Sequence, residues 1–228
     1  MDTIRSRLLQ VQSRIKTAAQ QNGRTDATVT LVAVSKGKTS HEIKEAYAAG
    51  QRRFGESYIQ EALPKIEALS GLDIEWHFIG PVQSNKTRHI ARHFDWVHSV
   101  DRIKIAQRLN DQRPASLPPL NICLQINISH ELTKSGTDLE ELGMLAREIK
   151  AFDRLRLRGL MAIPAPSDDY EEQRRMFMKV RQAREQLITG GRELDTLSMG
   201  MSHDMEAAIA EGATIVRIGT AIFGEREI

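Results

Sequence analysis

The chain has 228 residues and carries 32 lysines and arginines against 30 aspartates and glutamates, a formal net charge of +2. This near balance gives no general attraction for nucleic acid or for an anionic membrane surface. No apolar run approaches the roughly 20 residues that a membrane-spanning helix needs. The single cysteine, Cys123, permits no internal disulfide and suits a reducing compartment. We therefore expect a cytoplasmic protein that binds neither nucleic acid nor membrane, folded as a single domain over residues 1–228.

The first expected element is an amphipathic helix within the first 20 residues. Ile4, Leu8, Val11 and Ile15 recur at helical spacing, with charged residues between them. This pattern differs from that of a secretory signal peptide, so we interpret the segment as part of the fold.

Strand-like runs then alternate with helical stretches. Two of the helical stretches end in Gly50 and Gly212, the residue type that a left-handed helix end favours. Such alternation predicts a parallel sheet, and eight units in about 200 residues fit a closed barrel better than an open sheet. The sequence therefore predicts an α/β fold, a single (β/α)8 TIM barrel with an extra N-terminal helix. The eight runs are residues 29–35, 51–56, 74–80, 95–100, 121–129, 156–163, 196–200 and 214–219.

Barrels of this kind place their functional groups at the C-terminal ends of the strands. The candidates at these positions are Lys36, Glu56, Ser57, His77 to Gly80, Asn127, Ser129, Met161, Ser198 to Ser202 and Arg217 to Thr220.

The segments SMGMS (198–202) and IGTA (218–221) place glycines and hydroxyl groups after the seventh and eighth runs. Barrels commonly bind phosphate there, because glycine lets backbone N–H groups approach the anion and a short helix follows. Either segment alone is better explained as a chain turn, with Ser202 as a helix cap. Together they favour a phosphate site, and Gly219–Thr220 is the stronger half because Asp204 and Glu206 would repel an anion.

Lys36 follows the first run, LVAV, at the end of a strand of the buried type. A lysine near a phosphate site can pair with the phosphate, but the low dielectric of a barrel mouth also favours the neutral amine that forms imines. An aldehyde that carries a phosphate suggests pyridoxal 5′-phosphate (PLP). A sugar-phosphate aldolase would use the same two elements.

Arg217 shares strand parity with Gly219, so both should face the barrel interior while Val216 and Ile218 pack outward. An interior arginine needs a partner. Either the pyridine nitrogen of the cofactor lies there, or Arg217 forms a structural ion pair with an acid such as Glu56.

Other motifs carry less functional information. GKTS (37–40) ends like a phosphate-binding P-loop, but Val32 stands where that motif needs its first glycine. His89 and His93 have metal-ligand spacing without a third ligand, so we expect them to face solvent. His77 either lines the barrel or is a hydrogen-bonded core histidine, and we favour the latter. Cys123 is expected to be a buried core residue rather than a reactive thiol.

Motifs along nearly the whole chain together resemble one known family, the pyridoxal phosphate homeostasis proteins. They are AVSKGK, FGESYIQE, WHFIGPVQSNK, SVDR, QINIS with KSG, GLMAIP, LSMGMSHDMEAAI and VRIGTAIFG. The resemblance implies a barrel like the N-terminal domain of alanine racemase (PLP fold type III), without the C-terminal β-domain of the racemases.

The resemblance also implies a cofactor and its contacts. PLP would be bound as an imine on Lys36, with phosphate contacts from Ser198, Gly200, Gly219 and Thr220. Arg217 would face the pyridine nitrogen, and Ser57 and Met161 would also lie at the cofactor. The family usually has FGEN where this chain has Phe54-Gly55-Glu56-Ser57, which puts an asparagine contact there in doubt.

The expected function is intracellular PLP homeostasis without strong catalysis, so no catalytic residue is assigned. A permanently charged arginine disfavours protonation of the pyridine nitrogen and leaves a weaker electron sink. In addition, none of the tyrosines Tyr47, Tyr58 and Tyr170 stands at a strand end, where a second catalytic base is needed. The alternative is a one-base PLP enzyme, a weak racemase or transaminase. The expected partners are PLP, and amino acids or apo-enzymes that would receive it, and the chain is expected to be a monomer.

Overall fold

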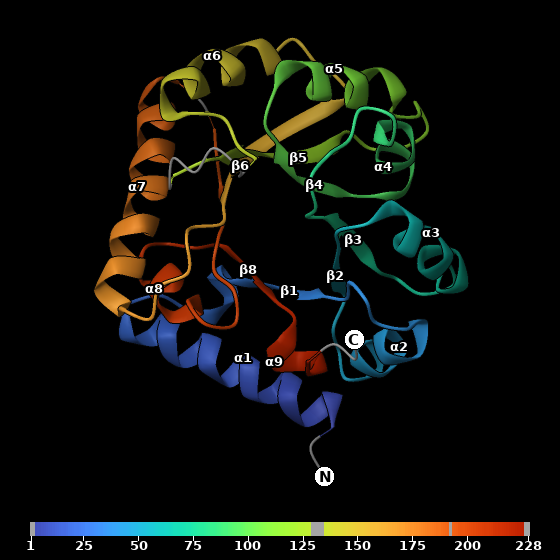
Figure 1. Cartoon of the computed structure of the whole chain (residues 1–228), viewed down its shortest axis with the longest axis vertical. Helices are drawn as coiled ribbons and strands as arrows, with labels where there is room; N and C mark the ends of the chain where they lie inside the picture. Colours follow the sequence, from blue (N-terminus) through green and yellow to red (C-terminus); the bar gives the residue numbers. More distant parts are fainter. Residues whose placement is uncertain (1–2, 129–134, 192, 226–228) are drawn as a thin grey trace.

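Eight parallel strands form a closed barrel in the computed structural model, which describes residues 3–128, 135–191 and 193–225. Neighbouring strands in the chain are neighbours in the barrel, and β8 pairs with β1 to close it (Figure 1). The eight-strand TIM barrel predicted from the sequence is confirmed, including the short second and seventh runs. The strands are β1 (Thr30–Val34), β2 (Arg53–Glu56), β3 (Glu75–Phe78), β4 (Trp96–Val100), β5 (Leu120–Ile126), β6 (Leu155–Ala162), β7 (Thr196–Ser198) and β8 (Ile215–Ile218).

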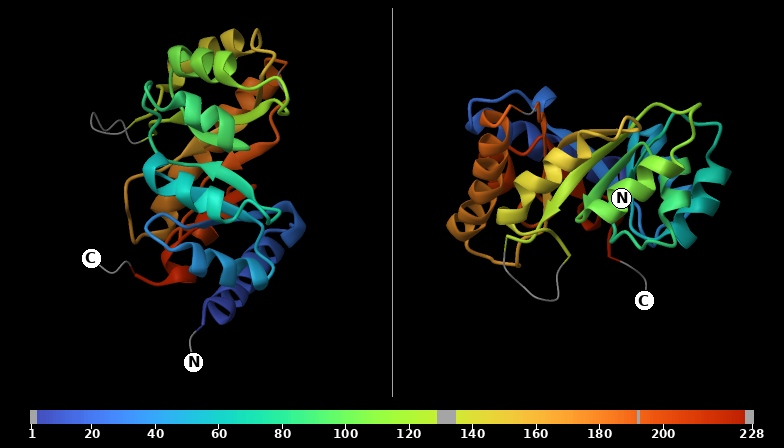
Figure 2. Two further views of the ribbon diagram at one scale, coloured as in Figure 1. Left: turned by 90° about the vertical axis from the view of Figure 1, so that its right-hand side faces the viewer. Right: turned by 90° about the horizontal axis from the view of Figure 1, so that it is seen from above.

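Helices surround the strands, as the two further views of Figure 2 show. The expected N-terminal helix is confirmed as α1, and it packs against α8 and α9 beside the β1–β8 seam. Within the described part of the chain, no helix is long and apolar enough to cross a membrane. The helices are α1 (Ile4–Gln21), α2 (Ser40–Ala48), α3 (Ile59–Ala68), α4 (Thr87–His93), α5 (Ile103–Gln112), α6 (Leu139–Ile149), α7 (Tyr170–Thr189), α8 (Met205–Ala210) and α9 (Thr220–Phe223), with a short 3₁₀ turn η1 (Asp26–Thr28).

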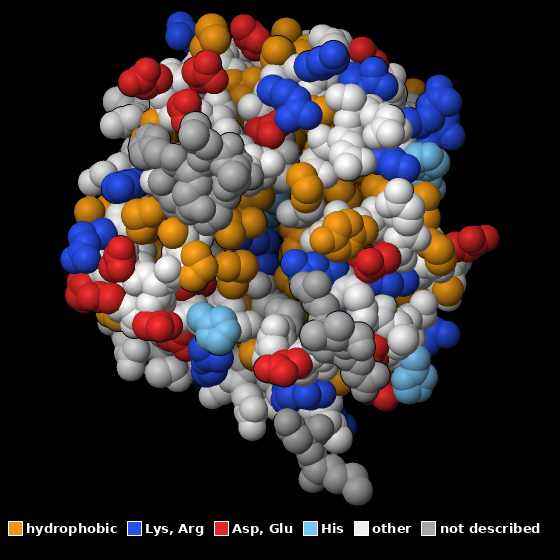
Figure 3. All heavy atoms as spheres, in the orientation of Figure 1, with side chains coloured by type: hydrophobic (Ala, Val, Ile, Leu, Met, Phe, Trp, Pro, Cys, Tyr) orange, Lys and Arg blue, Asp and Glu red, His pale blue; other side chains and the backbone are white. Residues whose placement is uncertain are grey.

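The C-terminal ends of the strands form the mouth of the barrel. Figure 3 shows a hollow near the middle of this face, with hydrophobic side chains on its rim and lysine or arginine side chains visible inside. One cavity of 290 Å³ at the mouth lies between the ends of β3, β5 and β6. Its lining residues are Ile79, Pro81, Gln125, Ile126, Asn127, Ser135 and Ile163.

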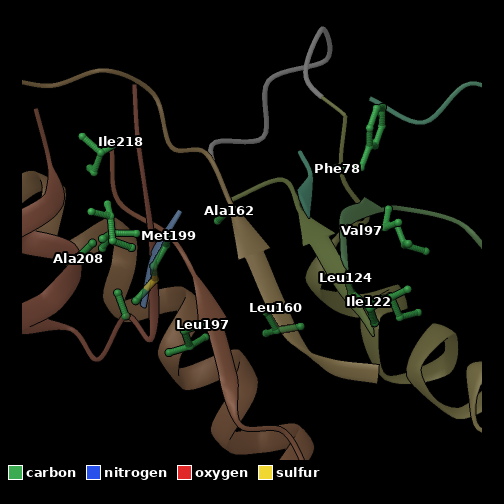
Figure 4. Close-up of a cluster of buried hydrophobic side chains, with 14 of the residues drawn as sticks. Phe78, Val97, Ile122, Leu124, Leu160, Ala162, Leu197, Met199, Ala208 and Ile218 are labelled. Atoms are coloured by element: carbon green, nitrogen blue, oxygen red, sulfur yellow. The ribbon is translucent and has the colours of Figure 1, made fainter. Parts of the chain in front are cut away.

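The apolar core has two parts. The larger part fills the space between strands and helices, and the outward-facing side chains of β4 to β8 contribute to it (Figure 4). The smaller part lies inside the barrel, where alternate residues of each strand point inward. It consists of Val32, Trp96, Cys123, Met161 and Ile215. The predicted core position of Cys123 is therefore confirmed.

The helix ends follow the predicted signals. Gly50 and Gly212 have φ of 101° and 91°, the left-handed conformation expected after α2 and α8. Asp204, and not Ser202, is the N-cap residue of α8. The four predicted apolar positions of α1, from Ile4 to Ile15, are all buried.

His89 and His93 face solvent on α4, as expected. The Nδ1–H group of His93 donates one hydrogen bond to the backbone oxygen of His89. Among the described residues, no group of three or more histidines, cysteines and carboxylates could hold a metal ion.

Candidate functional site

Lys36 lies on the rim of the barrel beside the end of β8. β1 and β8 pair in parallel up to Ala33 and Ile218, so the segments that follow them leave the barrel side by side. Side chains alternate along a strand, so Val32 and Val34 point into the barrel and Ser35 points outward. Lys36, two residues after Val34, is the next position on the inward side. Lys36 is half-buried. The backbone of Lys36 and the predicted phosphate segment at Gly219 therefore lie side by side on one rim, and the contact of the Lys36 amine with a cofactor remains a prediction.

Helix α3 holds the turn on both sides of Lys36. The Lys65 ammonium donates to the backbone oxygen of Ser35 at 2.9 Å, and the backbone N–H of Gly37 donates to a Glu61 carboxylate oxygen at 2.9 Å. The residues before and after Lys36 are therefore both tied to the same helix. This arrangement limits the backbone freedom of the lysine.

Lys38 is a second lysine in the turn after β1 and the nearest alternative to Lys36 as an imine-forming residue. The Lys38 ammonium donates to the backbone oxygens of Phe223 and Glu225 at 3.2 and 3.1 Å. These bonds direct Lys38 to the end of α9, so Lys36 remains the better candidate. Lys134 and Ser129 lie outside the described residues.

Arg217 lies inside the barrel, as its strand parity predicted. Its side chain is almost fully buried and donates from Nη1 to Ser198 Oγ at 2.7 Å and from Nη2 to the backbone oxygen of Ala162 at 3.0 Å. Burial lowers the pKa of Arg217 to about 10, which still leaves the guanidinium charged at neutral pH. Among the residues that the structure describes, no carboxylate forms an ion pair with it.

The alternative ion pair between Arg217 and Glu56 is wrong. Glu56 Oε1 instead accepts from Ser35 Oγ at 2.6 Å and from Lys65 Nζ at 2.9 Å. The physical reason is parity: Gly55 faces the barrel interior, so Glu56, the next residue, faces outward to α3. Burial raises the pKa of Glu56, although Lys65 and Ser35 oppose this shift.

The predicted phosphate segments have backbones that suit a close approach. Gly200 has φ of 97°, a conformation that side chains rarely adopt. A Cβ on Gly219 would lie 3.3 Å from the backbone oxygen of Val34, so glycine lets the ends of β1 and β8 come together. Thr220 is exposed and begins α9. The contacts of Gly200, Gly219 and Thr220 with a phosphate remain predictions.

The other three candidates lie in different surroundings. Ser198 is buried, and its hydroxyl contacts Arg217 and His98 inside the barrel. Met161 is fully buried in the interior apolar cluster, paired in register with Ser198. Ser57 is half-buried at the rim, where its backbone carbonyl approaches Gly80 so closely that a Cβ there would lie 2.1 Å from the oxygen. Their cofactor contacts also remain predictions.

His77 fits both descriptions offered from sequence. It lines the lower part of the barrel, and both ring nitrogens are hydrogen-bonded, to Glu75 and to His98. His98 and Glu75 were not among the residues predicted from the sequence. The available signal was parity, because polar residues stand at inward positions on β3, β4, β7 and β8.

Together these residues fit PLP. A half-buried amine and glycine-rich backbone share one rim, and a buried guanidinium that pairs with no described carboxylate lies below them. The first two groups suit an aldehyde and a phosphate, and the third suits a pyridine nitrogen that stays unprotonated.

The fold and this rim define a barrel of the racemase type. The family model described as "Alanine racemase, N-terminal domain" matches residues 7–227. A pyridoxal phosphate homeostasis protein of Pseudomonas aeruginosa is 58% identical over 227 residues, covering 100% of this chain and 97% of its own length. The protein of that name from Escherichia coli K12 is 55% identical, covering 100% and 98%. The chain belongs to the pyridoxal phosphate homeostasis protein family, as its motifs predicted.

Solved structures agree with this fold. The structure of PipY from Synechococcus elongatus PCC7942 with PLP bound has a TM-score of 0.85 and 37% identity, covering 97% of this chain and 100% of that one. An alanine racemase from Corynebacterium glutamicum has a TM-score of 0.68 at 18% identity and covers 94% of this chain and 61% of that one. The latter likeness concerns the fold alone.

Proposed function

We propose that this protein binds PLP as an imine on Lys36 and takes part in PLP homeostasis. The observation that carries the proposal is Arg217, a buried cation without a described carboxylate partner, on the strand that leads into Gly219 and Thr220 and pairs with the strand of Lys36. The names of the relatives and the PLP in the PipY structure support the same cofactor.

Each group has a distinct task in this proposal. Lys36 supplies the amine, while α3 fixes the backbone on either side of it. Ser198, Gly200, Gly219 and Thr220 bind the phosphate, and Ser57 and Met161 complete the surroundings of the ring. Arg217 faces the pyridine nitrogen. Bound PLP supplies an electron sink, and a neighbouring guanidinium keeps this sink weak by disfavouring a proton on the ring nitrogen.

This weak sink favours a carrier over an enzyme. Amines exchange with imines reversibly, so an incoming amino acid or an apo-enzyme lysine can take the cofactor without redox or hydrolytic chemistry. We propose that the protein acts in this way in the cytoplasm, as a single-domain monomer.

The covalent linkage is tested by reduction and mass mapping. Purified protein is loaded with PLP and reduced with borohydride, which makes an imine permanent. We expect the added mass on the peptide that contains Lys36, and loss of the visible imine absorption in Lys36→Ala. Lys44 is an exposed lysine of α2, so Lys44→Ala is the control. This variant should keep both the added mass on the Lys36 peptide and the visible imine absorption. An unchanged spectrum in Lys36→Ala would overturn the assignment.

The enzyme alternative is tested by exchange at the α-carbon. The loaded protein is incubated with single L-amino acids in deuterium oxide. Loss of cofactor without deuterium incorporation is the expected result for a carrier. Rapid incorporation with one amino acid would show a racemase or transaminase instead.

A further inference from the structure

A continuous chain of hydrogen bonds crosses the interior of the barrel below the proposed cofactor site. From Arg217 on β8 it passes to Ser198 Oγ at 2.7 Å, and from there to His98 Nδ1 at 2.7 Å. It continues from His98 Nε2 to His77 Nδ1 at 2.9 Å and from His77 Nε2 to Glu75 Oε1 at 2.8 Å. Residues of four strands, β8, β7, β4 and β3, are thereby joined.

The two ends of the chain lie in different environments. Arg217 is 4% exposed, whereas the Glu75 side chain is 39% exposed. Glu75 borders a 390 Å³ polar cavity at the end of the barrel opposite the mouth, together with Arg53 and Asp195. The chain therefore connects the buried guanidinium with a carboxylate that water reaches from the other side.

Charge fixes the direction of every bond in the chain. A guanidinium can only donate, so Ser198 Oγ accepts from Arg217 and keeps its own hydrogen for His98 Nδ1. At the other end an ionised carboxylate can only accept, so His77 Nε2 carries a hydrogen. The hydrogen bond from His77 lowers the pKa of Glu75, which agrees with an ionised Glu75.

The middle bond follows from the two ends. Burial lowers the pKa of His77, while Glu75 and Asp95 oppose that shift and Arg53 reinforces it. Burial, His77 and Arg217 together lower the pKa of His98 well below its ordinary value. With both rings neutral, His77 Nδ1 has no hydrogen and accepts from His98 Nε2–H. Both histidines are then in the Nε2–H form, and every donor points from Arg217 towards Glu75.

Packing holds the rings in this arrangement. The His77 ring stacks on the indole of Trp96, with 5.6 Å between ring centroids and 11° between ring planes. The His98 ring also lies against this indole, with 5.8 Å between ring centroids. The hydroxyl and the carbonyl that accept from Arg217 are neutral, and among the described carboxylates Asp204 attracts the guanidinium without an ion pair, so the buried cation is weakly compensated. The oriented chain adds a distant negative charge to that compensation.

We propose that Glu75, His77, His98 and Ser198 are positioning residues that orient Arg217 through a directional hydrogen-bond relay, so that the far end of the barrel influences how firmly PLP is held. This inference rests on the proposed function for its ligand, but the relay itself belongs to the protein without PLP. Its two consequences are therefore measured separately.

The first measurement is ¹⁵N NMR of the histidine rings in the PLP-free protein. We expect His77 and His98 to be neutral Nε2–H tautomers from pH 5.5 to 8. Glu75→Gln should shift the His98 ring signals although Glu75 does not touch His98, because the anion that orients the chain is gone. Asp195→Asn removes a carboxylate from the same cavity without breaking the chain, and should leave these signals unchanged. A charged or Nδ1–H His98, or one indifferent to Glu75→Gln, would overturn the relay.

The second measurement is the dissociation constant of PLP. We expect Glu75→Gln to weaken binding about threefold to tenfold, as the loss of one charge-assisted hydrogen bond in a series implies, and Asp195→Asn to leave it unchanged. Equal affinities of the two variants would overturn the positioning role. If the unaltered protein bound no PLP, the proposed function would fail, and the NMR result would still decide whether the relay exists.

Discussion

Arg217 and Cys123 both face the barrel interior, and burial acts on both in favour of the uncharged form. It lowers the pKa of Arg217 to about 10 and raises the pKa of the Cys123 thiol to about 12. At neutral pH the arginine therefore stays a cation while the cysteine stays a thiol. Because the thiolate is the reactive species, Cys123 acts as an interior packing residue. Of these two interior residues, only Arg217 carries a charge at neutral pH.

Glycines set a second constraint at the scale of single residues. A Cβ on Gly159 would lie 1.8 Å from the backbone oxygen of Thr196, so β6 and β7 would have to separate. We expect Gly159→Ala to destabilise the fold by about 3 kcal/mol or more. Gly143 in α6 has open space around its Cβ position, and Gly143→Ala should stabilise by about 0.5–1 kcal/mol because alanine restricts the unfolded chain. Urea unfolding of both variants measures this difference. Similar stabilities would contradict the close β6–β7 approach.

At the scale of elements, α3 fixes the lysine turn through a buried ion pair. Lys65 contacts both Glu56 and the backbone oxygen of Ser35, and Glu56 is fully buried. Lys65→Met leaves the Glu56 carboxylate without its cation. We expect a loss of about 3–5 kcal/mol in the free energy of unfolding, the usual cost of an uncompensated buried charge. Lys104→Met, at an exposed position of α5, is the control and should change little.

The stability lost in Lys65→Met should depend on pH, and the direction of that dependence follows from the pKa of Glu56. Without Lys65, the attraction that lowers the pKa of Glu56 is lost, so burial raises it further. A carboxyl whose pKa is higher in the folded than in the unfolded state binds more protons when folded, so stability falls as pH rises between the two values. The deficit of Lys65→Met against the unaltered protein should therefore be smaller at pH 5 than at pH 8. Adding Glu56→Gln should recover much of the loss at pH 8. A deficit independent of pH would contradict this account.

The elements themselves were accessible from sequence, but the partners of their polar side chains were not. The alternation of strand-like runs with helical stretches identified all eight strands, and terminal glycines marked the ends of α2 and α8, because both signals are local. The contact between His98 and Ser198 joins residues 100 positions apart, and nothing local indicates it. Parity placed Arg217 correctly. Strand parity applied to β2 predicts that the side chain of Glu56 points outward to α3. It would therefore have excluded Glu56 as the partner of Arg217.

At the scale of the whole molecule, the rim of the barrel mouth and the barrel interior both contribute residues to the proposed site. The mouth carries Lys36 and the glycine segments, while the relay extends below them to the polar cavity at the opposite end. A barrel usually fills its interior with branched apolar side chains. Among the described residues, five form the interior apolar cluster, and the hydrogen-bonded chain from Arg217 to Glu75 also lies in the interior. The interior is therefore both a core and a part of the proposed site.

The N-terminal helix α1 is expected to be part of this same cooperative unit, because it packs on α8 and α9 beside the β1–β8 seam. Leu8 is fully buried in α1, whereas its neighbour Leu9 is 54% exposed. We expect Leu8→Ala to lower the free energy of unfolding by about 2–5 kcal/mol through the cavity it leaves. Leu9→Ala should change it by about 0.5 kcal/mol or less.

Two probes decide whether α1 and the barrel unfold together. Both tryptophans, Trp76 on β3 and Trp96 on β4, belong to the barrel wall, so their fluorescence reports barrel unfolding, while circular dichroism reports all helices. In Leu8→Ala both signals should shift to lower urea by the same amount, because closure of the β1–β8 seam depends on the helix that covers it. A tryptophan transition that stays in place while helical signal is lost early would show that α1 detaches from a barrel that is stable without it.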